Sequence, residues 1–139
     1  MRIIKKAAVK HVLTEKMRDT MISDFHRDQK QLDKEIEQLR FQMQKQWKTA
    51  DTGWKKTEIK DRYDKEIEKR KEKKQRSEFQ LSQLEQLPLG TEIGSKEVDV
   101  IEEVAEGDEW PSRNQEIIVQ DGIVTQIRNK RSDDENGMV

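Results

Sequence analysis

The chain contains no cysteine, which excludes a disulfide scaffold and a thiolate nucleophile and is compatible with a reducing compartment. Its two histidines, His11 and His26, have no second histidine or cysteine at the spacing of metal ligands. A glycine-rich phosphate loop and a nucleophile elbow are also missing. We therefore expect a protein that is not an enzyme, with no catalytic residues, no metal, no cofactor and no small-molecule substrate.

Long apolar runs are missing as well. No segment approaches the ~20 apolar residues that span a bilayer, and the first six residues, Met-Arg-Ile-Ile-Lys-Lys, lack the apolar run of a signal peptide. Apolar residues make up 31% and charged residues 41% of the chain, at a net charge of −1. So little apolar material can form narrow stripes along helices and one small additional core. We expect a cytoplasmic protein that does not contact a membrane.

Proline and glycine are nearly absent from the first 87 residues, where Gly53 is the single glycine and no proline occurs. Before this glycine, apolar residues recur at three-, four- and seven-residue spacings, which is typical of a helix with a narrow coiled-coil stripe. They are Ile22, Phe25, Leu32, Ile36, Leu39 and Met43. After it the stripe is weaker, with no apolar residue between Glu68 and Glu78. The pattern predicts two long helical arms over residues 14–87, joined near residues 50–54.

Strand signals flank these arms. Residues 1–13 include β-branched side chains and predict one N-terminal strand. Residues 88–128 contain short runs of valine and isoleucine, with Asp121-Gly122 as a strong hairpin-turn signal. They predict a small antiparallel sheet or partly closed barrel, followed by a disordered polar tail over residues 129–139.

The arms can form either a hairpin folded at Gly53 or one long kinked rod. A rod would separate the N-terminal strand from residues 88–128 by about 100 Å, at ~1.5 Å per residue. A small isolated sheet is marginally stable, so the N-terminal strand needs a partner in the same chain. We favour the hairpin. The predicted fold is α+β, with a long antiparallel, coiled-coil-like helical hairpin and a small antiparallel β module formed by the N-terminal strand and the C-terminal strands.

Charge is distributed unevenly along the chain. Residues 50–76 carry 11 basic and 7 acidic side chains, whereas residues 92–128 carry 3 and 10. The densest stretch has six basic side chains in residues 69–76: Lys69, Arg70, Lys71, Lys73, Lys74 and Arg76. This basic cluster can contact phosphate in RNA or the ribosome, attract the acidic module of another copy, or simply solvate a coiled coil. We favour the solvated coiled coil.

Two tryptophans, Trp47 and Trp54, flank the predicted turn. They can form an exposed aromatic tip for a partner, because tryptophan is common at interface hot spots. Alternatively, they close the tip by packing on each other and on Met43, which is the interpretation we favour. Trp110 is expected to be the core aromatic residue of the β module.

Several short motifs together resemble the YlqD family, a group of small bacterial proteins with no established activity. They are Val12-Leu-Thr-Glu15, the helical run from Gln31 to Gln42, Leu87-Pro-Leu-Gly-Thr-Glu92, Gly107-Asp108 with Trp110, and the segment from Ile117 to Val124. The resemblance spans most of the chain and implies the same succession of strand, helical arms and β module in a bacterial cytoplasmic protein. It transfers no catalytic or binding residues.

Three classes of function fit these features. The first is a non-enzymatic interaction or scaffold protein that binds a protein partner or forms a homo-oligomer, because narrow apolar stripes are better buried between copies. The second is an RNA- or ribosome-associated factor acting through the basic second arm. The third is a holdase-like chaperone, by analogy of fold alone. We favour the first.

Overall fold

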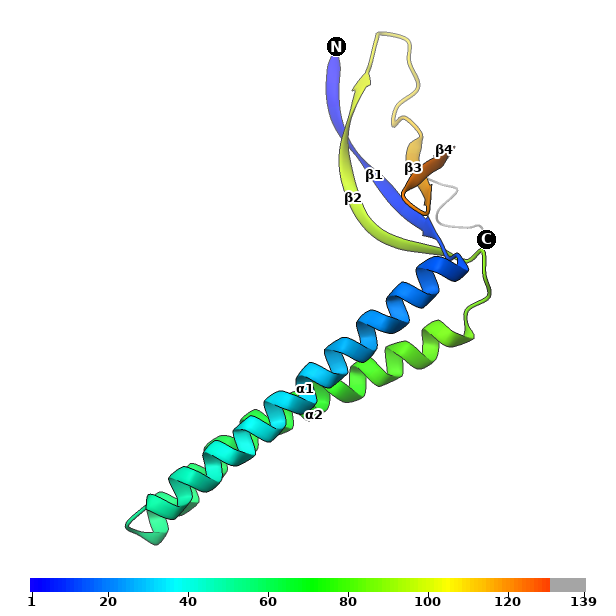
Figure 1. Ribbon diagram of the computed structural model, residues 1–139. Helices are drawn as coiled ribbons and strands as arrows, with labels where there is room; N and C mark the ends of the chain where they lie inside the picture. Colours follow the sequence, from blue (N-terminus) through cyan, green and yellow to red (C-terminus); the bar gives the residue numbers. More distant parts are fainter. Residues whose placement is uncertain (131–139) are drawn as a thin grey trace, which may run out of the picture. The chain divides into compact units, whose positions relative to one another are not determined.

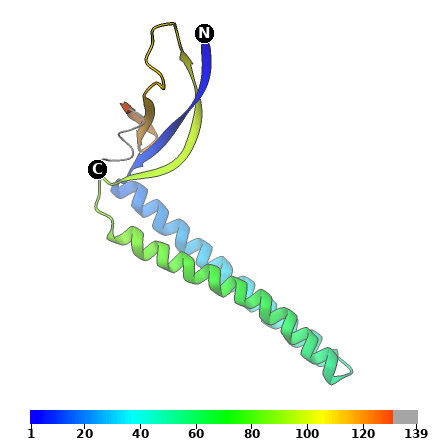
Figure 2. The same ribbon diagram turned by 180° about the vertical axis from the view of Figure 1, so that it is seen from behind.

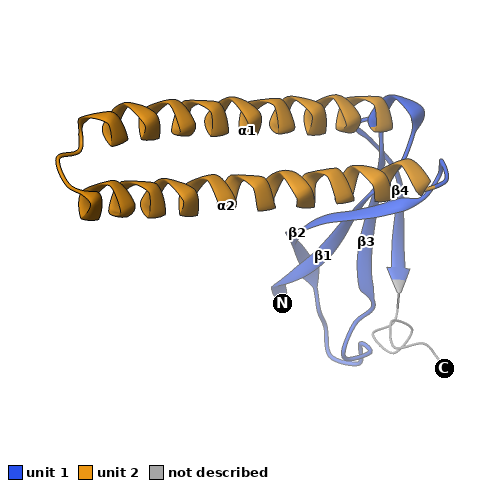
Figure 3. Ribbon diagram, turned by 90° about the horizontal axis from the view of Figure 1, so that it is seen from below, with its two compact units in different colours: residues 1–17, 88–139 blue, residues 18–87 orange. Residues whose placement is uncertain are grey.

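The computed structural model describes residues 1–130 (Figure 1). Its elements are, in chain order, β1 (Arg2–Val12), α1 (Glu15–Thr49), α2 (Gly53–Gln86), β2 (Glu92–Glu103), β3 (Asn114–Gln120) and β4 (Ile123–Lys130). They divide into two compact units (Figure 3). Residues 18–87 form the helical unit, and the described residues 1–17 and 88–130 form the sheet unit. The predicted α+β fold with a helical hairpin is confirmed.

In the helical unit, α1 and α2 run antiparallel side by side, as both ribbon views show (Figures 1 and 2). α1 begins directly after Thr14, whose Oγ1 accepts a hydrogen bond from the Met17 amide at 3.1 Å. Thr52 caps α2 in the same way, accepting from the Lys55 amide at 3.2 Å. Both caps satisfy amide groups that the first helical turn leaves without a partner.

The turn between the arms differs from the prediction at Gly53. Residues 50–52 make the connection, and Gly53 is already the first residue of α2. Gly53 does not adopt a positive φ, and a Cβ there would meet no atom within 4 Å. The chain therefore reverses without using the conformational freedom of its one mid-arm glycine, because Thr52 supplies the helix start.

The arms share a thin apolar core. Ile36 of α1 is buried, as are Tyr63, Ile67, Leu81 and Leu84 of α2. Polar contacts complete the packing: Gln46 donates to the Tyr63 hydroxyl at 2.7 Å. Where the second arm lacks apolar residues, Lys74 Nζ lies 2.8 Å from Asp33 Oδ1 of α1. Ion pairing thus replaces apolar contact along the polar stretch between Glu68 and Glu78.

The sheet unit contains a four-stranded sheet in the order β2-β1-β3-β4. β1 pairs antiparallel with β2, and β3 pairs antiparallel with β4. However, β1 and β3 are parallel, with Ala7 opposite Gln115, so the sheet is mixed rather than wholly antiparallel. Asp121 and Gly122 have φ of 49° and 81° and form the predicted turn. β4 continues to Lys130, so the tail predicted from residue 129 begins inside this strand, and residues 131–139 lie outside the described residues.

The sheet curls so that its two edge strands approach each other. Arg128 of β4 donates two hydrogen bonds to the Glu92 carboxylate of β2, at 2.6 and 2.8 Å. In a flat sheet these strands would be about 14 Å apart, three strand spacings, so the contact needs curvature as well as long side chains. Between them on this concave face, Lys10 Nζ lies 2.6 Å from Glu116 Oε2. A network of four charges therefore occupies the inside of the curl.

Candidate interaction surfaces

The two histidines lie in different units of the structure. His11 lies half-buried on β1 in the sheet unit, and His26 is exposed on α1 in the helical unit. Over residues 1–130, no three His, Asp or Glu side chains are grouped so that they could hold a metal ion. Likewise, neither of the two described helices has the length and apolar character needed to cross a membrane.

The basic cluster of residues 69–76 is partly neutralised by carboxylates of the helical unit. Arg70 Nη1 lies 2.9 Å from Glu66 Oε2, and Lys74 contacts Asp33. The hydrogen bonds from Arg70 and then Lys69 lower the pKa of Glu66, and the hydrogen bond to Asp33 raises the pKa of Lys74. The other three cations, Lys71, Lys73 and Arg76, are exposed. The sequence alone predicts the cluster, but it does not show which of its cations form ion pairs with carboxylates in the folded chain.

The tip of the hairpin, residues 43–62, exposes both tryptophans to different degrees. Trp54, the second residue of α2, is 73% exposed, and Trp47, in the last turns of α1, is 45% exposed. The expected closure of the tip by packed tryptophans is therefore wrong for Trp54. Because α2 begins one residue before Trp54, this residue belongs to a helix rather than to a loop core.

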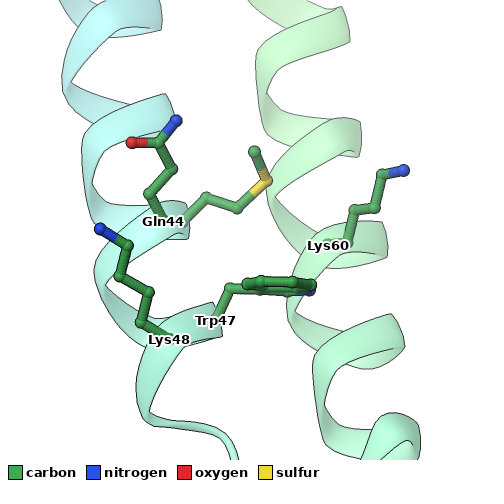
Figure 4. A pocket seen from close by; sticks show the side chains of 5 residues that line it. Gln44, Trp47, Lys48 and Lys60 are labelled. Atoms are coloured by element: carbon green, nitrogen blue, oxygen red, sulfur yellow. The ribbon is translucent and has the colours of Figure 1, made fainter.

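Trp47 instead lines an open pocket of about 500 Å³ together with Met43, Gln44, Lys48 and Lys60 (Figure 4). Figure 4 shows the indole reaching from α1 toward α2, with the two lysines on either side. Lys56 Nζ lies 4.4 Å from the centroid of the Trp47 ring. Lysine side chains and an aromatic ring are thus brought together from both arms.

This association of cations with rings recurs around the tip. Lys45 Nζ lies 5.3 Å from the Phe41 ring centroid, and the Arg62 guanidinium lies 5.3 Å from the Tyr63 centroid. Attraction to the ring quadrupole stabilises such pairs without neutralising the cation. Sequence reasoning missed this feature, because the contact between Trp47 and Lys56 depends on how the chain reverses between them.

In the sheet unit, three exposed apolar side chains lie on the outer strand β4, and Ile4 of β1 and Ile101 of β2 are exposed as well. Ile123, Val124 and Ile127 are 67%, 55% and 62% exposed. Trp110, in the connection between β2 and β3, is 69% exposed, so the prediction that it forms the core of the β module is wrong. The small core holds Ala7, Leu13 and Ile118 instead.

The convex face of the sheet carries a row of apolar side chains beside the Lys5–Glu102 ion pair, whereas its concave face holds the charge network around the buried Ile118. The strand register places Val9, Ile117 and Ile127 side by side on the convex face, and His11, Val119 and Val124 in the next row. Val98 and Val100 of β2 lie on the same face opposite Ala7 and Lys5. Most of these side chains are only half-buried. The convex face therefore leaves a band of apolar side chains only partly covered.

Comparisons with known proteins identify a family of related sequences and a solved structure of similar fold. A family model described as "YlqD protein" matches residues 1–128. The chain is 34% identical over 132 residues to an uncharacterised protein named YlqD from Bacillus subtilis (strain 168), covering 94% of this chain and 100% of that protein. It also resembles a crystal structure of a protein of unknown function from Synechococcus sp. WH 8102, with a TM-score of 0.71 and 16% identity over 92% of this chain and 94% of the other. This last likeness concerns the fold.

Proposed function

The chain belongs to the YlqD family, and we propose that it is a non-enzymatic scaffold protein of the cytoplasm that assembles with itself through strand β4. The observation that carries this proposal is the difference between the two edges of the sheet. An edge strand presents unpaired backbone groups that another strand can bind, and proteins protect such edges with charges and bulges.

The β2 edge has this protection. Its exposed side chains include Lys96, Glu97, Asp99 and Glu103. Its pairing with β1 shifts register between Ala8 and Lys10, where β2 contains an extra residue. Charges and a bulge both oppose the addition of a further strand.

The β4 edge has fewer of these devices, because its only charged residues are Arg128 and Lys130, at its C-terminal end. Residues 123–130 contain no acidic side chain and no proline, and the register shift of this pair lies near its turn. Arg128, which could repel a second copy, is held by Glu92 on the concave face. Strand β4 also exposes three apolar side chains of high β-propensity: Ile123, Val124 and Ile127.

A second copy of the same strand fits this edge. In a two-fold arrangement, β4 pairs antiparallel with its equivalent and places isoleucine and valine of one copy against isoleucine and valine of the other. The half-buried convex face continues from Ile127 to Ile117 and Val9, so the apolar contact can extend beyond the edge strand. This extension matters because a stable interface needs about 800 Å² from each partner.

Substitution of Ile127 by Lys tests the proposal in the full-length protein. We expect the wild type to sediment as a dimer or a larger assembly and the Ile127→Lys variant to sediment as a monomer. Ile101→Lys is the matched control, because Ile101 is 72% exposed on the opposite edge strand and should leave the assembly unchanged. Circular dichroism would verify that both variants are folded.

Single cysteines locate the contact, since the chain has none of its own. Gln126→Cys, near the middle of β4, should form cross-linked dimers with a short bifunctional maleimide, whereas Glu97→Cys on β2 should not. A wild type that is monomeric at all concentrations, or dimers cross-linked through position 97 but not 126, would contradict the proposal.

A further inference from the structure

We propose that the tip of the helical hairpin binds single-stranded nucleic acid, with exposed tryptophan faces stacking on bases and the surrounding lysines contacting phosphates. The site borders the basic cluster of residues 69–76 at Lys69 and does not include the other five cations of that cluster. The inference is independent of the self-association proposed above, because it concerns only the helical unit.

The first observation that supports the inference is that, in the part of the chain that the structure describes, the basic side chains of the tip form no ion pairs. The tip carries six basic and three acidic side chains. Among residues 1–130, no ion pair joins any of these six cations to a carboxylate; they are Lys45, Lys48, Lys55, Lys56, Lys60 and Arg62. Further along the same helix, Lys69, Arg70 and Lys74 all have carboxylate partners. Cations of the arm thus form ion pairs within the fold, whereas the cations of the tip are available to bind an anion.

The second support is the position of the aromatic rings among these charges. Trp54 forms a wall of two open clefts of about 380 and 550 Å³. The first cleft is also lined by Lys55 and Arg62, and the second by Arg62 and Lys65. At its far end the second cleft is lined by Lys69, which is paired with Glu66. Trp47, between Lys48 and Lys60, provides a second ring (Figure 4). Alternating rings and cations are the arrangement with which proteins hold single strands without reading their sequence.

A single-stranded nucleic acid has both phosphates for the lysines and free base faces for the tryptophans, whereas other anions offer only the negative charge. In a duplex the bases are stacked on each other, so an exposed indole finds no free base face. The side chains of an acidic peptide supply negative charge, but a carboxylate offers no aromatic face on which Trp54 and Trp47 can stack. The acidic side chains Glu58 and Asp61 also line the clefts beside Trp54, which favours contact with a base there and with phosphates at the lysines.

The experiment uses the full chain and a short fluorescently labelled oligothymidylate or oligouridylate. Anisotropy should report binding at low salt that weakens as salt increases, because phosphate contacts release counterions. Trp54→Ala should weaken binding by about tenfold or more, the effect expected from loss of one stacked base. Phe79→Ala is the matched control, since Phe79 is a 64% exposed aromatic residue on the same helix, outside the tip.

Two further measurements separate stacking from general attraction. In a variant with Trp47→Phe and Trp110→Phe, the fluorescence of Trp54 should be quenched when the oligonucleotide binds. Lys48→Gln with Lys60→Gln should reduce the slope of affinity against salt. The triple variant Lys71→Ala, Lys73→Ala and Arg76→Ala should retain most of the binding.

Three outcomes would overturn the inference. The first is no binding at low salt. The second is binding that survives Trp54→Ala but is lost in the triple variant, which would assign the contact to the basic cluster. The third is equal affinity for a polyglutamate peptide of similar charge, which would identify an acidic protein as the partner.

Discussion

Lys10 and Glu116 form an ion pair between the two parallel strands of the sheet, with 2.6 Å between Nζ and Oε2. The Glu116 side chain is 4% exposed and that of Lys10 is 32% exposed. Because the pair joins strands that are far apart in the sequence, it fixes the one parallel contact in an otherwise antiparallel arrangement.

Breaking this pair should destabilise the sheet unit. Lys10→Met removes the ion-pair partner of a buried carboxylate, and we expect the free energy of unfolding to fall by about 3 kcal/mol. Replacing both residues, as Lys10→Met with Glu116→Leu, should cost less than the sum of the single changes. Urea unfolding of the four proteins measures this coupling. The exposed pair of Lys6 and Asp99, also 2.6 Å apart, is the control, and its removal should change stability much less.

The contact between Glu92 and Arg128 predicts how stability depends on pH. The hydrogen bonds from Arg128 hold the pKa of Glu92 below its ordinary value of 4.5, while partial burial opposes the shift. A carboxyl group with a lowered pKa in the folded state stabilises the fold above that ordinary value and loses this contribution as the pH falls below it. The free energy of unfolding should therefore decline as the pH is lowered through 4.5 and beyond. Glu92→Gln should make the decline shallower, and an unchanged slope would contradict the assignment.

The two glycines at turns should respond in opposite ways to alanine. Gly53→Ala should raise the free energy of unfolding by up to about 1 kcal/mol, because Gly53 is helical and has room for a Cβ. Gly122→Ala should lower it by about 1–2 kcal/mol, since the φ of Gly122 is +81°. Thermal or urea unfolding checks both. Destabilisation by Gly53→Ala would show that the arms need glycine in order to reverse.

The thin core of the helical unit should be sensitive to truncation. Ile67 is 5% exposed, and Ile67→Ala should reduce the free energy of unfolding by about 2–4 kcal/mol. Phe79→Ala, on the exposed side of the same helix, should change it by less than about 0.5 kcal/mol. Helical circular dichroism followed during unfolding distinguishes the two variants. Similar effects from both would mean that Phe79 is buried in an assembly.

Local patterns in the sequence were sufficient for the elements of the fold. Apolar spacing along residues 14–87 predicts the two arms, and Asp121-Gly122 predicts the last hairpin. Both signals act over a few residues, and the structure confirms both. The assignment of the reversal to Gly53 failed, because Thr52 caps the second helix and the turn needs no special backbone conformation.

Features that depend on distant parts of the chain were not predictable in this way. The parallel pairing of β1 with β3 follows from the tertiary arrangement rather than from either strand. The exposure of Trp110 was also missed, because the core of the sheet unit is formed by smaller side chains. At the tip, the sequence identifies Trp47 and Trp54 as candidates. Only the packing of the arms determines which lysines contact rings and which cations are neutralised by carboxylates.

The parallel contact of β1 with β3 also sets an order for folding during synthesis. The helical arms contact residues that are made in direct succession, so the hairpin can form as soon as its second half leaves the ribosome. β1, by contrast, is made first but finds its neighbours only among residues 92–120, after the whole hairpin has been completed. The first strand therefore remains without its partners throughout that interval, and we expect its lysines, Lys5, Lys6 and Lys10, to oppose its aggregation.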